Sequence, residues 1–260
     1  MATNGSSSGV VPAVDTTAPA EAEQEQEFNP LEMLMQMAAA QAAEPEPEPE
    51  EEYGPLPMSE TEYMAQQGAP NAAQEKAIDV YLYPHATDGT LYSPSQQVNY
   101  ALRMDKPVPA KYQHVVEGMD SMMHDLGYNA NLTRYDRVGF LWRLLDGQNH
   151  ENMTEAQLRD KLVGMSYQDK GLVSTSHNDF VNAPPKSQKV FKEKTVEIRI
   201  KAKSGTQAMM PGNGGGGALG EIVLGRNQWF KITDVKMPAG VYGRSGDKWY
   251  QKVILEVEVG

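Results

Sequence analysis

Residues 164–176 read GMSYQDKGLVSTS, and residues 218–232 read ALGEIVLGRNQWFKI. Each stretch contains short runs rich in β-branched and apolar residues next to glycine or asparagine, a pattern typical of strands. Between them, residues 195–201 read TVEIRIK and alternate strictly, which predicts a strand with one apolar face. Residues 252–259 form another apolar strand candidate. The second half of the folded region is therefore predicted to be a sheet.

The region before these strands is predicted to be mainly helical. Ser95 is placed to cap a helix, and Pro109 begins a longer helical pattern whose Met-rich apolar stripe ends at Gly127. We expect these methionines to belong to the core. Residues 78–95 are expected to form a turn-rich entry. Helices followed by strands indicate an α+β domain and argue against a parallel βαβ array.

Charge is very unevenly distributed along the 260 residues. Fifteen acidic residues and no Lys or Arg precede residue 76, so the net charge of −12 divides into −15 before that residue and +3 after it. Residues 44–52 read EPEPEPEEE, a composition that cannot bury enough apolar area to order the chain. We predict a disordered acidic tail over 1–75, with short helices at 30–42 and 60–67, and one folded domain over 76–260.

Composition excludes several classes of site. The sequence has no cysteine, which excludes disulfides, thiolate zinc sites and a cysteine nucleophile, and its five histidines show no metal-ligand spacing. No signal pattern or membrane-spanning run is expected, so we expect a cytoplasmic protein, with virion packaging or delivery into a target cell as alternatives. No aromatic-basic motif appears, so nucleic acid is not an expected partner.

Three short motifs occur in a set order. They are, in sequence, Arg134 in a β-rich run, Ser174-Thr175-Ser176, and Glu221 after a Gly-rich loop. This order resembles the Arg…Ser-Thr-Ser…Glu pattern of the mono-ADP-ribosyltransferases related to bacterial exoenzymes and to phage-encoded enzymes. The resemblance covers residues 95–260. It implies two packed, mainly antiparallel sheets with flanking N-terminal helices, meeting at an NAD⁺ cleft.

The resemblance also implies an activity. The enzyme would take NAD⁺ as co-substrate, release nicotinamide and transfer ADP-ribose to a macromolecular acceptor, with protein as the expected class. Glu221 would stabilise the positive charge that develops on the ribose in the transition state. Ser174 would orient the site by hydrogen bonding. Arg134 would bind an NAD⁺ phosphate or hold the ribose, with Arg137 as the alternative arginine.

The remaining NAD⁺ contacts implied by the resemblance lie close to these motifs in the chain. Ser176 and Thr175 would shape the nicotinamide pocket, Thr133 would lie beside Arg134, and an aromatic ring after the Ser-Thr-Ser motif would pack on nicotinamide. Phe180 is the first candidate for that ring, and Phe191 is the second.

Acceptor recognition is assigned to the loop 205–220, at Gly217 and Leu219. Arginine-modifying members of the family have Glu where this chain has Leu219, and the Rho-modifying exoenzymes have Gln there. Leucine can neither deprotonate a guanidinium nor hydrogen-bond an amide. An unusual acceptor, an acceptor activated by another residue, and mainly NAD⁺ hydrolysis therefore stay open. A further alternative is a non-catalytic binding or virion-structural protein whose acidic tail binds a partner or mediates packaging.

Overall fold

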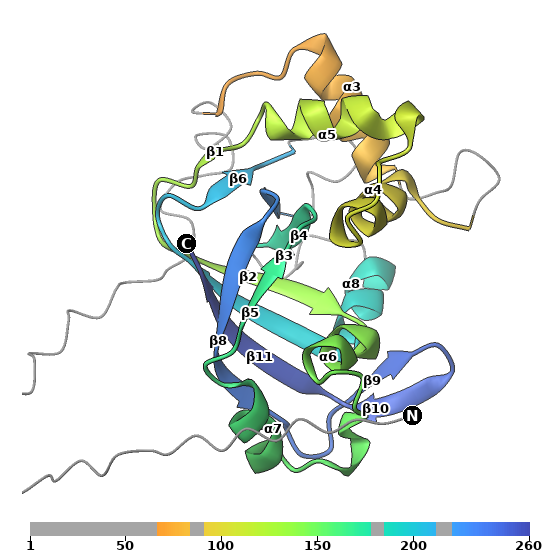
Figure 1. Ribbon diagram of the computed structural model, residues 1–260, viewed down its shortest axis with the longest axis vertical. Helices are drawn as coiled ribbons and strands as arrows, with labels where there is room; N and C mark the ends of the chain where they lie inside the picture. Colours follow the sequence, from red (N-terminus) through yellow and green to blue (C-terminus); the bar gives the residue numbers. More distant parts are fainter. Residues whose placement is uncertain (1–66, 84–90, 178–184, 212–219) are drawn as a thin grey trace, which may run out of the picture. The chain divides into compact units, whose positions relative to one another are not determined.

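The computed structural model describes residues 67–83, 91–177, 185–211 and 220–260. Three helices come first, namely α3 (Ala72–Leu82), α4 (Pro94–Arg103) and α5 (Gln113–Asp120), the last preceded by the short η1 (Ala110–Tyr112). They lie together at one end of the domain (Figure 1). None of the described helices has the length and apolar character needed to cross a membrane.

Strands and short helices alternate through the rest of the chain. In order they are β1 (His124–Asp125), β2 (Ala130–Asp136), α6 (Val138–Leu144), η2 (His150–Asn152), α7 (Glu155–Leu162), β3 (Ser166–Asp169), β4 (Val173–Ser176), α8 (Pro185–Lys192), β5 (Val196–Ala202), β6 (Gln207–Met209), β7 (Glu221–Leu224), β8 (Gln228–Lys236), β9 (Tyr242–Ser245), β10 (Lys248–Gln251) and β11 (Val253–Val259).

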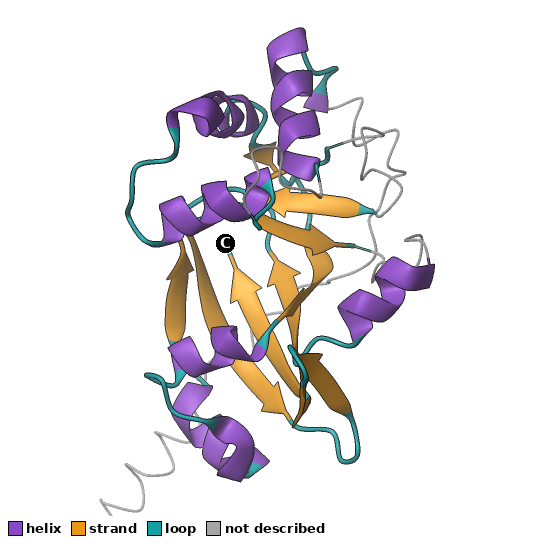
Figure 2. Cartoon of the chain, turned by 90° about the vertical axis from the view of Figure 1, so that its right-hand side faces the viewer, coloured by secondary structure: helices purple, strands orange, loops and turns teal. Residues whose placement is uncertain are grey.

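Nine strands form one curled sheet in the order β1-β6-β7-β4-β2-β5-β11-β8-β3, and β9 with β10 forms a separate hairpin. All pairs within the sheet are antiparallel except β5 with β11. Its two halves are joined through β2 and β4, where Thr133 pairs with Ser176. Figure 2 shows the strands on either side of this seam running in different directions. The predicted α+β class with mainly antiparallel strands and N-terminal helices is confirmed, and the two expected sheets are the halves of one curled sheet.

Two hydrophobic clusters hold these layers together. The larger lies within the curled sheet and includes the inward residues of β5, whose alternation between buried and outward positions is confirmed. The smaller lies between the three N-terminal helices and the strands β4, β6 and β7, and it includes Met119, Met122 and Val223. The prediction that the methionine stripe belongs to the core is therefore confirmed at Met119 and Met122.

Three details of the helical region differ from the sequence predictions. The expected turn-rich entry at 78–95 is wrong at its start, because α3 already covers this segment and buries Ile78 and Tyr81. The α4 cap is Ser93 rather than Ser95, because Pro94 takes the first helical position. The helix after Pro109 ends at Asp120, before the predicted stop, and the chain then enters β1.

The described part of the chain begins before the predicted boundary at 76. Asn71 caps α3 in a capping box with Gln74. Farther upstream, the Gln67 side chain exchanges two hydrogen bonds with the backbone of Met210, at 2.8 and 3.1 Å. The tail before residue 67 lies outside the described residues, as do the helices predicted at 30–42 and most of 60–67.

We therefore expect a fragment of residues 67–260 to be more stable than one of residues 76–260. The shorter fragment lacks the cap, the first turn of α3 and both bonds to Met210, and a lost helix cap alone typically costs about 1 kcal/mol. Urea unfolding of the two fragments, each compared with the full chain, measures the difference. Equal unfolding free energies would show that residues 67–75, which include the first turn of α3, do not contribute to stability.

Candidate active site

The paired strands β4 and β7 place Ser174 and Glu221 on one face of the sheet. Ser176 lies opposite Glu221, and Ser174 lies opposite Val223. Because side chains alternate along a strand, Ser174, two residues from Ser176, points to the same side as Glu221. Val223 shares this side and packs in the cluster beneath the N-terminal helices. The predicted catalytic pair therefore faces the helical layer.

A chain of hydrogen bonds connects this pair to the helices. The Ser174 hydroxyl is bonded to the Glu221 carboxylate. The Tyr81 hydroxyl of α3 lies 3.5 Å from Ser174 Oγ, and Asn99 Nδ2 of α4 donates to the Tyr81 oxygen at 3.0 Å. Tyr81 is buried, so its ring holds the hydroxyl in place. The contacts converge on Ser174, which fits an orienting role for this residue.

Glu221 is a buried acid, only 8% exposed. Burial disfavours its charged form and raises the pKa of the carboxyl to about 7, although the hydrogen bond from Ser174 acts in the opposite direction. At neutral pH this carboxyl therefore divides between its neutral and charged forms. Perturbed acids of this kind are characteristic of functional sites.

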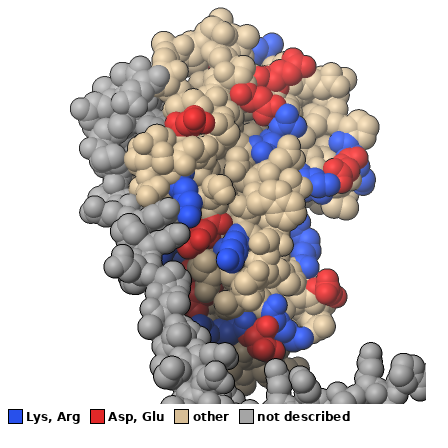
Figure 3. Space-filling view, turned by 60° about the vertical axis from the view of Figure 1, so that its left-hand side comes forward, with Lys and Arg blue, Asp and Glu red and all other residues tan. Residues whose placement is uncertain are grey.

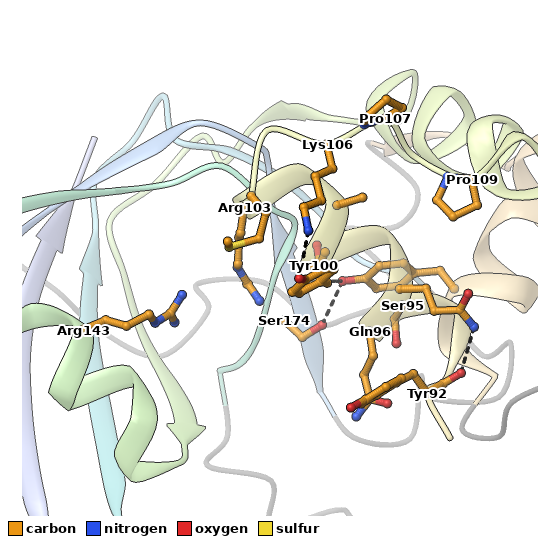
Figure 4. Close-up of a pocket in the computed structure, with 15 residues that line it drawn as sticks. Tyr92, Ser95, Gln96, Tyr100, Arg103, Lys106, Pro107, Pro109, Arg143 and Ser174 are labelled. Carbon is orange, nitrogen blue, oxygen red and sulfur yellow. Dashed lines mark hydrogen bonds between the residues drawn. The ribbon is translucent and has the colours of Figure 1, made fainter. Parts of the chain in front are cut away.

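A cavity of about 990 Å³ lies beside Ser174, between α4 and α6. Three cationic side chains line it, those of Arg103, Lys106 and Arg143, together with the aromatic rings of Tyr92 and Tyr100. Figure 4 shows Arg143 reaching from α6 toward the side of the cavity that Arg103 occupies. The lining thus supplies positive charge for phosphates and flat rings for heterocycles beside an acid, which fits a dinucleotide.

Asp169, at the end of β3, organises the cationic side of this cavity. Its carboxylate accepts two bonds from Arg103, at 2.7 and 3.0 Å, and one from Arg134 at 3.1 Å. Burial raises the pKa of Asp169, but Arg134 and Arg103 outweigh that effect and hold the pKa below its usual value. Glycine at 171 permits the close approach of α4, because a methyl group there would lie 2.8 Å from Asn99 Oδ1.

The predicted contact of Arg134 with NAD⁺ stays a prediction, and in this structure the side chain is held by two carboxylates. Its guanidinium bonds Asp169 on one side and Asp136, at 2.7 Å, on the other. Burial lowers the pKa of Arg134, but these two carboxylates raise it further, so the charge is permanent. Arg134 is not among the described residues that line the cavity. It is positioned to reach the cavity through Asp169 and Arg103.

The other predicted positions are divided between this site and other regions. Thr133 pairs with the buried Ser176 at the seam of the sheet, next to Glu221. Thr175 points to the opposite face and donates to the Ile222 carbonyl at 2.7 Å.

Arg137 is exposed at the start of α6 and lies near Lys194. Phe180, Gly217 and Leu219 lie outside the described residues, and Phe191 is half-buried at the end of α8.

Sequence reasoning missed Arg103, Tyr81 and Asp169 as site residues. Asn99 and Arg103 are four residues apart, a spacing that places both on one face of a helix and could have drawn attention to them. Asp169 gives no local signal, because its partners are 66 and 35 residues away in the chain. Among the described residues no group of three acidic or histidine side chains gathers closely enough to hold a metal ion.

Comparison with known structures identifies the fold. The Clostridium limosum C3 exoenzyme superposes with a TM-score of 0.56 at 18% identity, covering 77% of this chain and 90% of that chain. C3stau2 from S. aureus, solved with NAD, gives 0.54 at 16% identity, covering 82% and 99%. The Paenibacillus larvae toxin Plx2a gives 0.54 at 18% identity, covering 77% and 92%.

Sequence comparison reaches the same family. No curated protein sequence matches the chain. The family model described as ADP-ribosyltransferase exoenzyme, however, matches residues 60–258. This match spans the described helices, the curled sheet and both residues of the Ser174–Glu221 pair. The chain therefore belongs to the ADP-ribosyltransferase exoenzyme family and is an NAD⁺-dependent transferase.

Proposed function

We propose that the chain transfers ADP-ribose from NAD⁺ to a protein acceptor and that Glu221 is its catalytic carboxylate. The observation that carries this proposal is the buried Glu221, bonded to Ser174 at the edge of a cavity lined by cations and aromatic rings. A desolvated carboxylate interacts strongly with charge that appears next to it. The reaction generates such a charge on the ribose.

The bond that breaks joins the nicotinamide nitrogen to the ribose. Nicotinamide leaves with the bonding electron pair and becomes neutral, while the ribose acquires oxocarbenium character. Ionised Glu221 stabilises that charge, and the acceptor then forms a bond to the ribose and loses its proton. Ser174 holds the Glu221 carboxylate, and Tyr81 with Asn99 holds Ser174.

The cations of the cavity are suited to the two phosphates of NAD⁺. Arg103 presents a guanidinium whose orientation is fixed by its paired bonds to Asp169. Arg143 and Lys106 add charge from α6 and from the segment after α4. Arg134 acts as a positioning residue through Asp169, while Thr133, Thr175 and Ser176 shape the strands around the pair. Phe180 remains the proposed partner of the nicotinamide ring.

Acceptor choice is a separate matter, and we assign it to Gly217 and Leu219. Leucine lacks the acid or amide that members acting on arginine or on Rho have at this place, so we infer an acceptor with other chemistry. Mainly NAD⁺ hydrolysis is the second candidate, because cleavage needs Glu221 but not Leu219. Measuring nicotinamide release beside incorporation of labelled ADP-ribose into protein distinguishes transfer from hydrolysis.

A partner-binding role for the acidic tail, in the cytoplasm or in a virion, is compatible with either activity.

Replacing Glu221 with Gln should lower nicotinamide release by roughly a hundred- to a thousandfold, the usual effect of losing one preorganised electrostatic contact. NAD⁺ affinity should change little, because the contact matters mainly in the transition state. The neutral amide also avoids burying a charge, so the variant should melt at a higher temperature than the parent at pH 8. Full activity in this variant would refute the catalytic assignment, and Glu117→Gln, at an exposed position of α5, is the matched control.

The pKa of Glu221 predicts the pH profile. Only the ionised carboxylate can stabilise the oxocarbenium, so kcat/KM for nicotinamide release should be high above pH 7 and fall as the pH drops below about 7. Because burial raises this pKa, ionisation of Glu221 lowers the free energy of unfolding. Protonation of Glu221 at lower pH should therefore not destabilise the fold. Melting curves over the same pH range test that distinction. A profile that stays flat down to pH 5 would contradict the assignment.

The role of Arg134 can be separated from direct NAD⁺ binding by a double-mutant cycle with Arg103. Arg134→Lys keeps the charge but loses the fork that spans Asp136 and Asp169, so KM for NAD⁺ should rise severalfold with a smaller change in kcat. Once Arg103→Lys is present, adding Arg134→Lys should raise KM little further. Additive effects would indicate an independent phosphate contact, and Arg199→Lys on an exposed strand position is the control.

A further inference from the structure

The hairpin of β9 and β10 displays aromatic and basic side chains on its outer face. Trp249 lies directly opposite Arg244, and Tyr242 is two residues from Arg244 on the same strand. Alternation therefore puts all three side chains on one side of the hairpin. Tyr242 is 57% exposed and Trp249 is 52% exposed. Two large rings thus flank the Arg244 guanidinium, which also donates to the Gly246 carbonyl at 2.8 Å and to the exposed Asp247 carboxylate at 3.1 Å.

The hairpin is a firm platform for these side chains. Its inner face buries Tyr250, whose ring stacks on His150 and meets Trp142 edge to face. Gly243 lies so close to the backbone of Lys194 that a methyl group there would overlap it. The Arg244 amide donates to the Glu193 carbonyl at 2.5 Å. Figure 1 shows the hairpin projecting from the body of the domain while its base stays joined to the sheet.

A pocket of about 200 Å³ lies beside the hairpin at Arg244 and gathers three cations, Arg137, Lys194 and Arg244. The carboxylate in its lining, Glu193, also pairs with Lys189 at 3.7 Å. Burial lowers the pKa of Lys194 and nearby Arg137 lowers it further, while Asp136 acts in the opposite direction. Two cations therefore repel each other in a partly buried place. A bound anion would remove that repulsion.

We propose that this surface binds single-stranded nucleic acid, with a backbone phosphate in the pocket of Arg137, Lys194 and Arg244 and with bases stacked on Tyr242 and Trp249. An acidic peptide would satisfy the cations but would make no particular use of two exposed rings. Exposed aromatic rings beside a basic groove are the combination that binds single strands without reading their sequence. Figure 3 shows another face of the domain, on which acidic and basic side chains are interspersed.

Charge and position support the proposal. The chain from residue 76 onward carries a net charge of +3, although the whole chain is acidic. The helix α6 begins directly after Arg137 of this pocket and carries Arg143 of the larger cavity, and its seven residues span about 10 Å. The pocket and the larger cavity are therefore linked by one short helix. The proposal concerns binding and holds whether or not the chain modifies a protein.

Fluorescence anisotropy with a labelled single-stranded oligonucleotide of about 12 bases tests binding by the full chain at low salt. Trp249→Ala should weaken binding by roughly five- to a hundredfold, the usual effect of losing one stacked base. Trp229→Ala is the matched control, since Trp229 is 59% exposed on β8, and it should leave the affinity unchanged. Arg137→Ala should weaken binding and flatten its salt dependence, while Arg199→Ala should not.

Several results would overturn the proposal. The first is that the full chain does not bind the oligonucleotide. The second is that the Trp249 and Trp229 variants lose the same amount of affinity. The third is that the chain binds a duplex or polyglutamate as tightly as the single strand, with no dependence on Trp249. The last result would indicate a general surface for polyanions or acidic proteins. Because Trp249 and Arg137 are exposed, their variants should melt like the parent, and nicotinamide release should be unchanged in Trp249→Ala. These two measurements show that any loss of binding is local.

Discussion

The burial of one carboxylate, that of Glu221, constrains the rest of the site. A charge removed from water is unfavourable, and the rise of its pKa from 4.5 to about 7 corresponds to a destabilisation of roughly 3 kcal/mol once the group is fully ionised. The fold accepts this because β7 is paired on both sides and α3 with α4 covers its face. The same desolvation makes the carboxylate effective, since water does not screen it from charge that develops on the ribose.

A second constraint is the charge balance around Asp169. Three elements meet there, because Arg103 comes from α4, Arg134 from β2 and the carboxylate from β3. Removing Asp169 would leave the Arg103 guanidinium without its carboxylate, whereas Arg134 would keep Asp136. Breaking a buried pair in this way typically costs about 3–5 kcal/mol. Under the proposed function, Arg134 would therefore influence the cavity without lining it. The guanidinium of Arg134 positions the Asp169 carboxylate, and that carboxylate positions the Arg103 guanidinium, which lines the cavity.

The sequence predicted the parts of this structure that depend on local pattern. Strict alternation identified β5, and the order of the motifs led to Ser174 and Glu221. Other elements depend on contacts that local pattern does not encode. The helix α6 has no side-chain cap at Arg137, and the hairpin of β9 and β10 contains exposed aromatic residues that give no inward pattern. Arg103 joins the site only because β3 brings Asp169 to it. The positions of Phe180, Gly217 and Leu219 stay predictions.

The arrangement separates the chemistry from the surfaces that meet other molecules. The groups proposed for NAD⁺ cleavage lie on paired strands beneath packed helices, where geometry is fixed by the core. The fold is shared with exoenzymes at identities of only 16–18%. Outer surfaces are not bound by that requirement, because an exposed side chain such as Trp249 can change at little cost to stability. Differences in partner between this chain and its structural relatives should therefore arise on the hairpin and in the loops after β4 and before β7, and not in the buried pair.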